Sequence, residues 1–214
     1  TDRQRAFHES ESDEVLYGGA AGGGKTYIQC GDGLGYAAEF PESKQLILRR
    51  TFPELERNIV RQSLEMFPQK PFAKYNSTKH LWTFSNGSII EFGYLAREND
   101  VYLYQGSEWD VIRIDKATHF PYSSVDYLRS RLRGTKPYPR SMKFSTNPGN
   151  IGHGWVKKMF VDAAPYMQIF KREVVSRASG KKKTYRMQYI PSLATENPHI
   201  TEDYIFELEK KPEA

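Results

Sequence analysis

The residues with the clearest chemical capability form a glycine-rich loop near the start of the chain, Gly18-Gly19-Ala20-Ala21-Gly22-Gly23-Gly24-Lys25-Thr26. Residues 19–26 fit the pattern Gly-x-x-x-x-Gly-Lys-Ser/Thr, whose converging backbone N–H groups bind phosphate oxygens. Glycine leaves those N–H groups open to an anion, and the positive end of the following helix points at the same charge. The pattern assigns Lys25 to the β- and γ-phosphates of a nucleotide and the Thr26 hydroxyl to Mg²⁺.

The residues around this loop supply the strand and the helix that the motif needs. Val15-Leu16-Tyr17 is a short apolar run that predicts a buried strand, and Tyr27-Ile28-Gln29-Cys30 begins a helix. The alternative is a glycine-rich surface loop, but a chance match in a chain of this size is on the order of one in a hundred. The sequence therefore predicts a site for ATP and Mg²⁺.

A short helix over residues 1–10 precedes this strand and carries Gln4, whose amide can read the edge of an adenine. A solvent-facing helix residue is the alternative for Gln4. The predicted nucleotide-binding residues are Gln4, Gly19, Ala20, Ala21, Gly22, Gly23, Gly24, Lys25 and Thr26.

An acidic residue at the end of a second apolar run is the expected partner of this loop. Val111-Ile112-Arg113-Ile114-Asp115 predicts a buried strand that ends on a carboxylate, which can hold Mg²⁺ beside a phosphate-binding loop. Hydrolytic enzymes of this type commonly carry Glu at the next position, where this chain has Lys116. A protonated lysine cannot accept a proton from water, so Lys116 favours bound ATP over turnover.

Two further polar groups stand where strands are expected to end. Arg49 and Arg50 follow a strand over 45–48 and are expected to point toward the crevice where α/β folds bind ligands, or simply to frame the strand end. Thr146 and Asn147 end a strand over 141–147, where a sensor of the γ-phosphate would lie. A plain turn through Asn147-Pro148-Gly149-Asn150 is the alternative.

The pattern of elements indicates an α/β fold with a mostly parallel sheet flanked by helices. Asn86-Gly87 between two alternating runs predicts an added antiparallel hairpin over 80–92, with Trp82 and Phe84 in the core. Two more strands, over 167–175 and 184–190, are joined by a basic turn over 177–183 whose default reading is a solvated tip. We expect an ATPase core over 1–165 and a small lid or linker subdomain over 166–214.

Composition limits the class of protein further. The chain has 214 residues, a formal net charge of +5 and a pI near 9.1, which suits a polyanionic partner. The single cysteine, Cys30, excludes an internal disulfide and a cysteine-based zinc site. No stretch approaches 18 consecutive apolar residues and no signal-peptide pattern opens the chain, so we expect a soluble protein with no membrane partner.

Taken together, these motifs resemble the ATPase domain of the large terminase subunit of tailed bacteriophages and related prophages, over nearly the whole chain. The motifs that carry the resemblance are Gly18–Thr26, Leu48-Arg49-Arg50-Thr51-Phe52-Pro53-Glu54-Leu55, Tyr104-Gln105-Gly106, Ile114-Asp115, Ala117-Thr118-His119-Phe120, Ser130-Arg131-Leu132-Arg133, Thr146-Asn147-Pro148-Gly149 and Asn197-Pro198-His199. Only the glycine-rich loop is specific alone, and the order and spacing of the others make the resemblance strong.

The resemblance implies a P-loop NTPase fold of the RecA/ASCE type that drives double-stranded DNA into an empty capsid by hydrolysing ATP. It places Gln4 near adenine, Asp115 at the metal, and Thr146 and Asn147 in the motif that couples hydrolysis to movement. An arginine of the same or a neighbouring subunit should complete the site, and Arg131 and Arg133 are the candidates.

The implied setting is a ring of identical subunits in the host cytoplasm, docked on the portal of the procapsid. The implied partners are DNA, the portal protein and the small terminase subunit. The acidic cluster of the family's C-terminal nuclease domain is missing from this chain, so we expect no DNA cleavage. Lys116 departs from the family pattern and puts turnover in question. The competing hypotheses are a helicase-like nucleic-acid-dependent ATPase and a non-hydrolysing ATP-binding assembly module.

Overall fold

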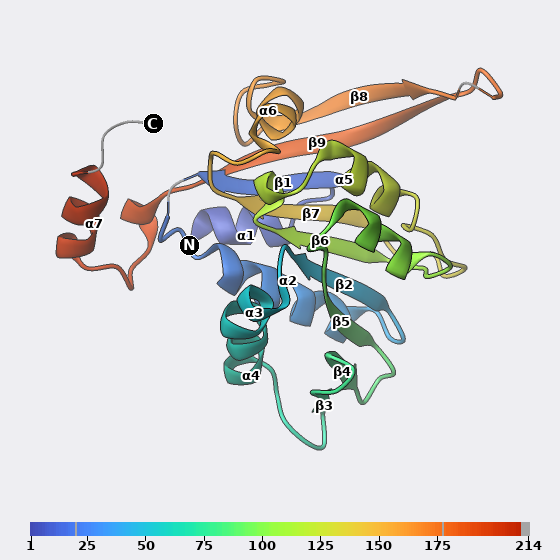
Figure 1. Ribbon diagram of the computed structural model, residues 1–214, viewed down its shortest axis with the longest axis horizontal. Coiled ribbons are helices and arrows are strands. Elements are labelled where there is room, and N and C mark those ends of the chain that lie inside the picture. Colours follow the sequence, from blue (N-terminus) through green and yellow to red (C-terminus); the bar gives the residue numbers. More distant parts are fainter. Residues whose placement is uncertain (20, 177, 211–214) are drawn as a thin grey trace.

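A nine-stranded sheet with the order β3-β4-β5-β2-β6-β7-β1-β9-β8 organises the computed structural model, which describes residues 1–19, 21–176 and 178–210 (Figure 1). Six neighbouring strands, from β5 to β9 in that order, pair in parallel. Antiparallel pairing is confined to β3-β4-β5 at one edge and β8-β9 at the other. The strands are β1 (Glu14–Gly19), β2 (Lys44–Arg49), β3 (Ala73–Asn76), β4 (Leu81–Phe84), β5 (Ile89–Tyr94), β6 (Val111–Asp115), β7 (Ser141–Thr146), β8 (Ile169–Val175) and β9 (Lys182–Ser192).

Helices cover both faces of this sheet and bury its apolar residues. The apolar core on one face involves α2, α3 and α4, with α1 beside them, and the core on the other face involves α5 and α6. The helices are α1 (Asp2–His8), α2 (Lys25–Glu39), α3 (Phe52–Leu55), α4 (Arg61–Met66), α5 (Tyr122–Arg129), α6 (His153–Val156) and α7 (Glu202–Glu209). Segments with 3-10 or π-helical geometry are η1 (Glu56–Val60), η2 (Glu98–Tyr104), η3 (Ala117–His119), η4 (Lys157–Val161) and η5 (Ala194–Glu196). Among the described helices, none combines the length and apolar character needed to span a membrane.

These elements confirm the predicted fold class, a mostly parallel sheet flanked by helices with an added antiparallel hairpin. Trp82 and Phe84 are buried as expected, and the indole N–H of Trp82 donates to the Ser63 hydroxyl at 3.0 Å. After β2 a continuous helical segment begins at Phe52 and runs through α3, η1 and α4 to Met66.

The C-terminal hairpin is bound to the sheet more closely than the sequence suggested. β9 lies between β1 and β8 and pairs in parallel with β1 from Met187 to Ser192. The chain therefore completes its sheet only after residue 166, within the segment that the sequence assigned to a small lid or linker subdomain. The physical reason is that β9 is buried on both faces beside β1: Met187 packs in the core that contains Leu16, and Ile190 packs in the core on the other face. The division into residues 1–165 and 166–214 as functional units stays a prediction.

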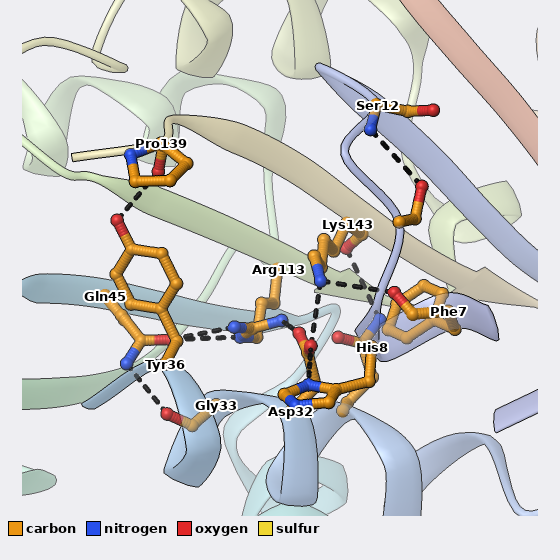
Figure 2. Close-up of polar contacts among 12 residues, drawn as sticks. Phe7, His8, Ser12, Asp32, Gly33, Tyr36, Gln45, Arg113, Pro139 and Lys143 are labelled. Carbon is orange, nitrogen blue, oxygen red and sulfur yellow. Dashed lines mark hydrogen bonds and ion pairs between the residues drawn. The ribbon is translucent and has the colours of Figure 1, made fainter. Parts of the chain in front are cut away.

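A cluster of charged side chains is buried between α2 and the sheet, as Figure 2 shows. Asp32 of α2 lies at its centre and is 2% exposed. Its carboxylate accepts from the Arg113 guanidinium of β6, from the Lys143 ammonium of β7 at 2.8 Å and from the His8 ring at 2.8 Å. Arg113 also donates to the Gln45 amide oxygen of β2 at 2.9 Å. One carboxylate thus connects α1, α2 and two central strands.

The cluster contains more positive than negative charge, and this governs its electrostatics. Burial alone would raise the pKa of Asp32, but Arg113 and Lys143 outweigh burial and hold that pKa well below its usual range. The hydrogen bond to Asp32 raises the pKa of His8 above its ordinary value of 6.5. Arg113 is fully buried, so its charge depends on this carboxylate for compensation.

The substitution Asp32→Asn should therefore destabilise the fold strongly. The neutral amide would leave two buried cations without an anion, which typically costs about 3–5 kcal/mol of unfolding free energy. Urea unfolding followed by circular dichroism measures the loss. The matched control is Asp126→Asn, which removes a 60% exposed partner of Arg129 and should cost less than about 1 kcal/mol. Equal losses in the two variants would contradict the central role of Asp32.

The stability that His8 adds should depend on pH. Because folding raises the pKa of His8, its contribution is fully present below the unfolded pKa of 6.5 and is lost as pH rises through the folded value. The difference in urea midpoint between the wild type and His8→Gln should thus be larger at pH 5.5 than at pH 8.5. A difference that stays constant across this range would show that His8 does not titrate against Asp32.

Candidate nucleotide-binding site

A cleft of about 630 Å³ lies at the carboxyl ends of the parallel strands, where the glycine-rich loop joins β1 to α2. Binding sites of parallel α/β folds form at this edge because the loops there leave backbone and polar groups free. The cleft is lined by Ala21, Gly22, Gly23, Gly24, Lys25, Thr26, Tyr27, Arg49, Asn58, Gln62, Asp115, Lys116, Asn147, Asn197, His199, Ile200, Thr201 and Tyr204. The structure thus brings together residues 21–26 of the predicted loop, Asp115 and Asn147, whereas the predicted Gly19 does not line this cleft.

The glycines of the loop are required by its shape. Gly24 precedes α2 with a φ of 70°, a left-handed conformation that favours glycine. A Cβ atom on Gly23 would lie 1.9 Å from the Ser192 hydroxyl oxygen, so no larger residue fits without a shift. The hydroxyl of Tyr17, a buried residue of β1, donates to the Gly23 carbonyl at 3.1 Å and so holds the loop against the sheet. Ala20, also predicted to bind nucleotide, lies outside the described residues.

The segment after β9 closes one side of the cleft. The Asn197 amide donates to the Gly22 carbonyl at 2.6 Å, and a Cβ on Gly22 would lie 2.3 Å from Ile200. α7 follows this contact and leads away from the sheet (Figure 1). The C-terminal segment therefore contacts the glycine-rich loop at Gly22 and also contributes lining residues to the cleft.

Gln4 lies beside the loop but does not line the cleft. Its side chain accepts from the N-terminal ammonium group at 2.9 Å and donates to the Gly24 carbonyl at 3.4 Å. The amide is thus occupied in capping α1 and supporting the loop. A contact between Gln4 and adenine stays a prediction.

Lys25 begins α2 and points into the cleft wall formed by β9. Its ammonium group donates to the Ser192 hydroxyl at 3.4 Å. The pKa of Lys25 is lowered to about 8, chiefly by burial; Asp115 acts against this shift, and nearby Lys116 contributes to it. A phosphate anion brought to this position would stabilise the charged form of Lys25.

Asp115 ends β6 as predicted and is held in a defined orientation. Its Oδ1 accepts from the Ser145 hydroxyl at 2.7 Å and from the Lys116 backbone N–H at 3.1 Å. Its Oδ2 is buried without a hydrogen bond among the described residues and lies 3.5 Å from Nε of Arg49. Arg49 also donates to the Glu54 carbonyl at 3.0 Å. An arginine at the end of β2 therefore faces the carboxylate at the end of β6.

Lys116 lines the cleft directly after Asp115 and has an unusual backbone. Its φ of 59° and ψ of 48° place a non-glycine residue in the left-handed region, at the start of η3. Such a conformation costs roughly 1–2 kcal/mol and persists only where surrounding contacts impose it. Here the Asp115 carboxylate accepts the Lys116 N–H, and the His119 N–H donates to the Lys116 carbonyl at 2.8 Å.

A threonine pair links the segment after Asp115 to the end of β7. The hydroxyls of Thr118 and Thr146 lie 2.8 Å apart, and the Thr118 hydroxyl donates to the Asn147 carbonyl at 3.0 Å. The Asn147 side-chain oxygen is buried without a hydrogen-bond partner in the described part of the chain. Thr146 thus supports the strand end, while Asn147 lines the cleft.

Two buried side-chain oxygens, Oδ2 of Asp115 and Oδ1 of Asn147, show whether this cleft could hold a metal ion. Among the described residues these two oxygens accept no hydrogen bond, and Oδ2 of Asp115 forms only the ion pair with Arg49. Such oxygens at a cleft wall suit a hard cation such as Mg²⁺, either directly or through its water. Thr26 lines the same cleft, and its hydroxyl would add a third oxygen donor. The residues present therefore fit Mg²⁺.

The structure places Arg131 and Arg133 away from this cleft. They follow α5 near Trp109, which bridges Leu132 and precedes β6 at its amino end. The distance along the strand from Trp109 to Asp115 is about 20 Å at roughly 3.3 Å per residue. Arg131 packs over the Tyr127 ring, and Arg133 pairs with Glu108 at 3.2 Å. Neither arginine reaches the cleft of its own chain, and a role in a neighbouring subunit stays a prediction.

Sequence reasoning missed several residues that the cleft contains. Ser192 and Asn197 come from a segment far along the chain, and only the resemblance of Asn197-Pro198-His199 marked it. Tyr27 and Tyr204 are exposed aromatic residues at the cleft with no pattern to distinguish them. Arg49 was expected to face a crevice, and the structure places it there.

The close contact between Gly23 and Ser192 predicts a compensating pair of substitutions. Gly23→Ala should displace the loop and weaken binding of a fluorescent ATP analogue by roughly tenfold, since overpacking costs about 1–3 kcal/mol. Adding Ser192→Gly removes the clashing hydroxyl and should restore most of the affinity.

Two single variants serve as controls. Ser192→Gly alone should bind nearly normally, and Gly31→Ala in α2 meets only Met66 at 3.7 Å and should be neutral. Failure of the double variant to recover would show that the packing of β9 does not shape the loop.

Comparison with known proteins identifies the family to which this chain belongs. Residues 16–213 match the family described as "Terminase large subunit, T4likevirus-type, N-terminal". The large terminase of a thermophilic bacteriophage has a similar fold, with a TM-score of 0.76 and 15% identity, covering 100% of this chain and 50% of that chain. The chain therefore spans about half the length of that protein.

Two further solved structures share the fold. The same thermophilic phage terminase in complex with ATP-gamma-S has a TM-score of 0.71 and 16% identity, covering 100% of this chain and 50% of that chain. The N-terminal domain of the DNA packaging ATPase from bacteriophage phi29 has a TM-score of 0.53 and 13% identity, covering 89% of this chain and 94% of that chain. Among curated proteins, no significant match is found. Because the family model covers almost the whole chain, this protein belongs to the N-terminal family of T4-like terminase large subunits.

Proposed function

We propose that the chain binds ATP with Mg²⁺ in the cleft beside the glycine-rich loop and acts as the ATPase domain of a motor that packages viral double-stranded DNA. The observation that carries this proposal is the meeting of Lys25, Thr26 and Asp115 in one cleft of a terminase-family chain. The structure of the thermophilic phage relative with ATP-gamma-S supports nucleotide binding at this fold.

The positions of a few cleft residues support specific roles in binding ATP and Mg²⁺. The loop N–H groups and Lys25 would bind the phosphates, because the positive end of α2 and the ammonium group act on the same anion. Thr26 and Asp115 would hold Mg²⁺, with Asn147 beside them. When bound, Mg²⁺ supplies charge stabilisation to the transferring phosphoryl group.

Arg49 balances the charge of Asp115 within the cleft. Its guanidinium faces Oδ2 of Asp115 at 3.5 Å, and both side chains are almost completely buried. Binding of a cation at Asp115 would release Arg49 toward the incoming phosphates, where its charge would be compensated again. We propose that Arg49 is a phosphate-facing residue of this site.

The proposed motor works with partners that family membership suggests. These are double-stranded DNA, a portal protein, a small terminase subunit and further copies of the chain arranged in a ring. A neighbouring subunit in such a ring would bring Arg131 or Arg133 toward the cleft. The proposed location is the host cytoplasm, at the portal of the procapsid.

Lys116 makes hydrolysis slow in this proposal. Lys116 lines the cleft at the position where the family's usual carboxylate would orient and deprotonate water. Lys116→Glu should therefore raise the rate of phosphate release by roughly 10²-fold or more, in line with the usual contribution of general-base catalysis. The measurement is steady-state phosphate release with ATP, Mg²⁺ and DNA.

The matched control is Lys116→Gln, which removes the positive charge without adding a base and should leave hydrolysis near the wild-type rate. Both variants should bind ATP. A rate that Lys116→Glu leaves unchanged would contradict the role proposed for Lys116. Tight ATP binding with no phosphate release in that variant would select the non-hydrolysing assembly module.

A further inference from the structure

The hairpin formed by β8 and β9 extends past the amino ends of the parallel strands, whereas the nucleotide cleft lies at their carboxyl ends. Glu14, the first residue of β1, pairs with Met187 of β9, so residues 182–186 of β9 run past the start of β1. At about 3.4 Å per residue this extension measures about 17 Å. Figure 1 shows the two strands reaching away from the other elements.

The extension is basic and exposed. Residues 169–187 contain one acidic residue, Glu173, against a set of cations that the structure describes as exposed: Lys171, Arg172, Lys181, Lys182, Lys183 and Arg186. Among the described contacts, Glu173 pairs with Lys182 at 2.9 Å and Glu11 pairs with Arg186 at 3.3 Å. The charges of Lys171, Lys181 and Lys183 have no ion pair among those contacts.

The cross-strand register places like charges against each other. Lys171 lies directly opposite Arg186, and like charges in this position destabilise an antiparallel pair. Val174 and Val175 are also exposed, at 43% and 52%, so no apolar core compensates at the outer end of the hairpin. A strand pair that accepts this repulsion gains stability when a polyanion lies along it.

The shape of the hairpin favours one kind of polyanion. A two-stranded β-ribbon fits the major groove of B-form DNA, and lysines on flexible stems reach the phosphates that border the groove. Phosphate contacts carry no sequence information, which suits a motor that must move DNA of any sequence. The hairpin and the cleft lie at opposite ends of β9, so DNA and ATP do not compete for space.

We infer that the β8–β9 hairpin binds the phosphate backbone of double-stranded DNA through Lys171, Lys181 and Lys183. This inference rests on the proposed function, because it names the surface on which the proposed motor holds its substrate. Lys171 and Lys183 lie on opposite faces of the hairpin, so the duplex would be contacted from both faces of the projecting ribbon.

The test is the salt dependence of duplex binding by the full chain. A labelled duplex of about 30 base pairs is titrated with the protein between about 50 and 200 mM NaCl, and the affinity is measured by fluorescence anisotropy. In the triple variant Lys171→Gln, Lys181→Gln and Lys183→Gln, the slope of log affinity against log salt should fall in magnitude by about 2–3. The dissociation constant at about 100 mM NaCl should rise by about tenfold or more.

The other edge of the sheet supplies a control with the same loss of charge. Lys70, Lys74 and Lys79 are exposed on and beside β3, and changing all three to Gln also removes three positive charges. This control should keep the wild-type slope and affinity. Equal weakening of both triple variants would overturn the inference, because it would show that net charge alone attracts DNA. An unchanged slope in the hairpin variant would overturn it as well.

Two further measurements separate this inference from the proposed function. Binding of an ATP analogue without DNA should be the same in the wild type and the hairpin variant, which also reports intact folding. Absence of ATP binding in the wild type would contradict the proposed function, whereas normal ATP binding with no duplex binding would overturn the hairpin inference alone. Tighter binding of a single strand of the same sequence would overturn the assignment to duplex DNA.

Discussion

A single buried carboxylate fixes how the parts of the nucleotide cleft stand relative to one another. Asp32 lies two turns into α2, the helix that begins with Lys25, and it joins that helix to Arg113 of β6 and Lys143 of β7. Those two strands end at the cleft in Asp115 and Thr146. The charges are almost fully buried, so they are screened little by solvent and tolerate little displacement. The cleft inherits its geometry from this cluster, although no member of the cluster lines it.

The cleft itself holds an excess of positive charge. Lys25, Arg49 and Lys116 line it together with Asp115, and burial already lowers the pKa of Lys25. These cations repel one another, and a polyphosphate relieves that repulsion. Lys116 adds to this attraction while contributing no base. The positive charge of Lys116 therefore disfavours hydrolysis of ATP in the proposed site and favours its tight binding.

Sequence reasoning succeeded where local signals decide structure and failed where distant segments meet. The glycine-rich loop, the strand ending at Asp115 and the hairpin turn at Asn86-Gly87 follow from short patterns, and the structure contains all three. The insertion of β9 beside β1 brings together residues far apart in the chain, and alternation of apolar residues does not specify a partner strand. Ser192 and Asn197 became site residues through that pairing. Only the resemblance marked Arg131 and Arg133 as candidates to complete the site, from the same or a neighbouring subunit. The structure places them near Trp109, before the amino end of β6, so a role in a neighbouring subunit stays a prediction.

β9 gives the two proposed activities a common physical element. One end of the strand carries the basic tip, and the other end places Ser192 against Lys25 and Gly23. Between them the strand is hydrogen-bonded to β1 over Met187–Ser192 and to β8 over Lys182–Gln188, so no flexible loop interrupts it. Force applied by DNA at the tip would therefore pass along a paired ladder to the phosphate-binding loop.

Conversely, a shift of the loop on nucleotide binding would meet β9 directly, because a Cβ atom at Gly23 already has no room beside Ser192. The tight packing at Gly23 is what makes such coupling mechanical, since a looser contact would absorb the movement.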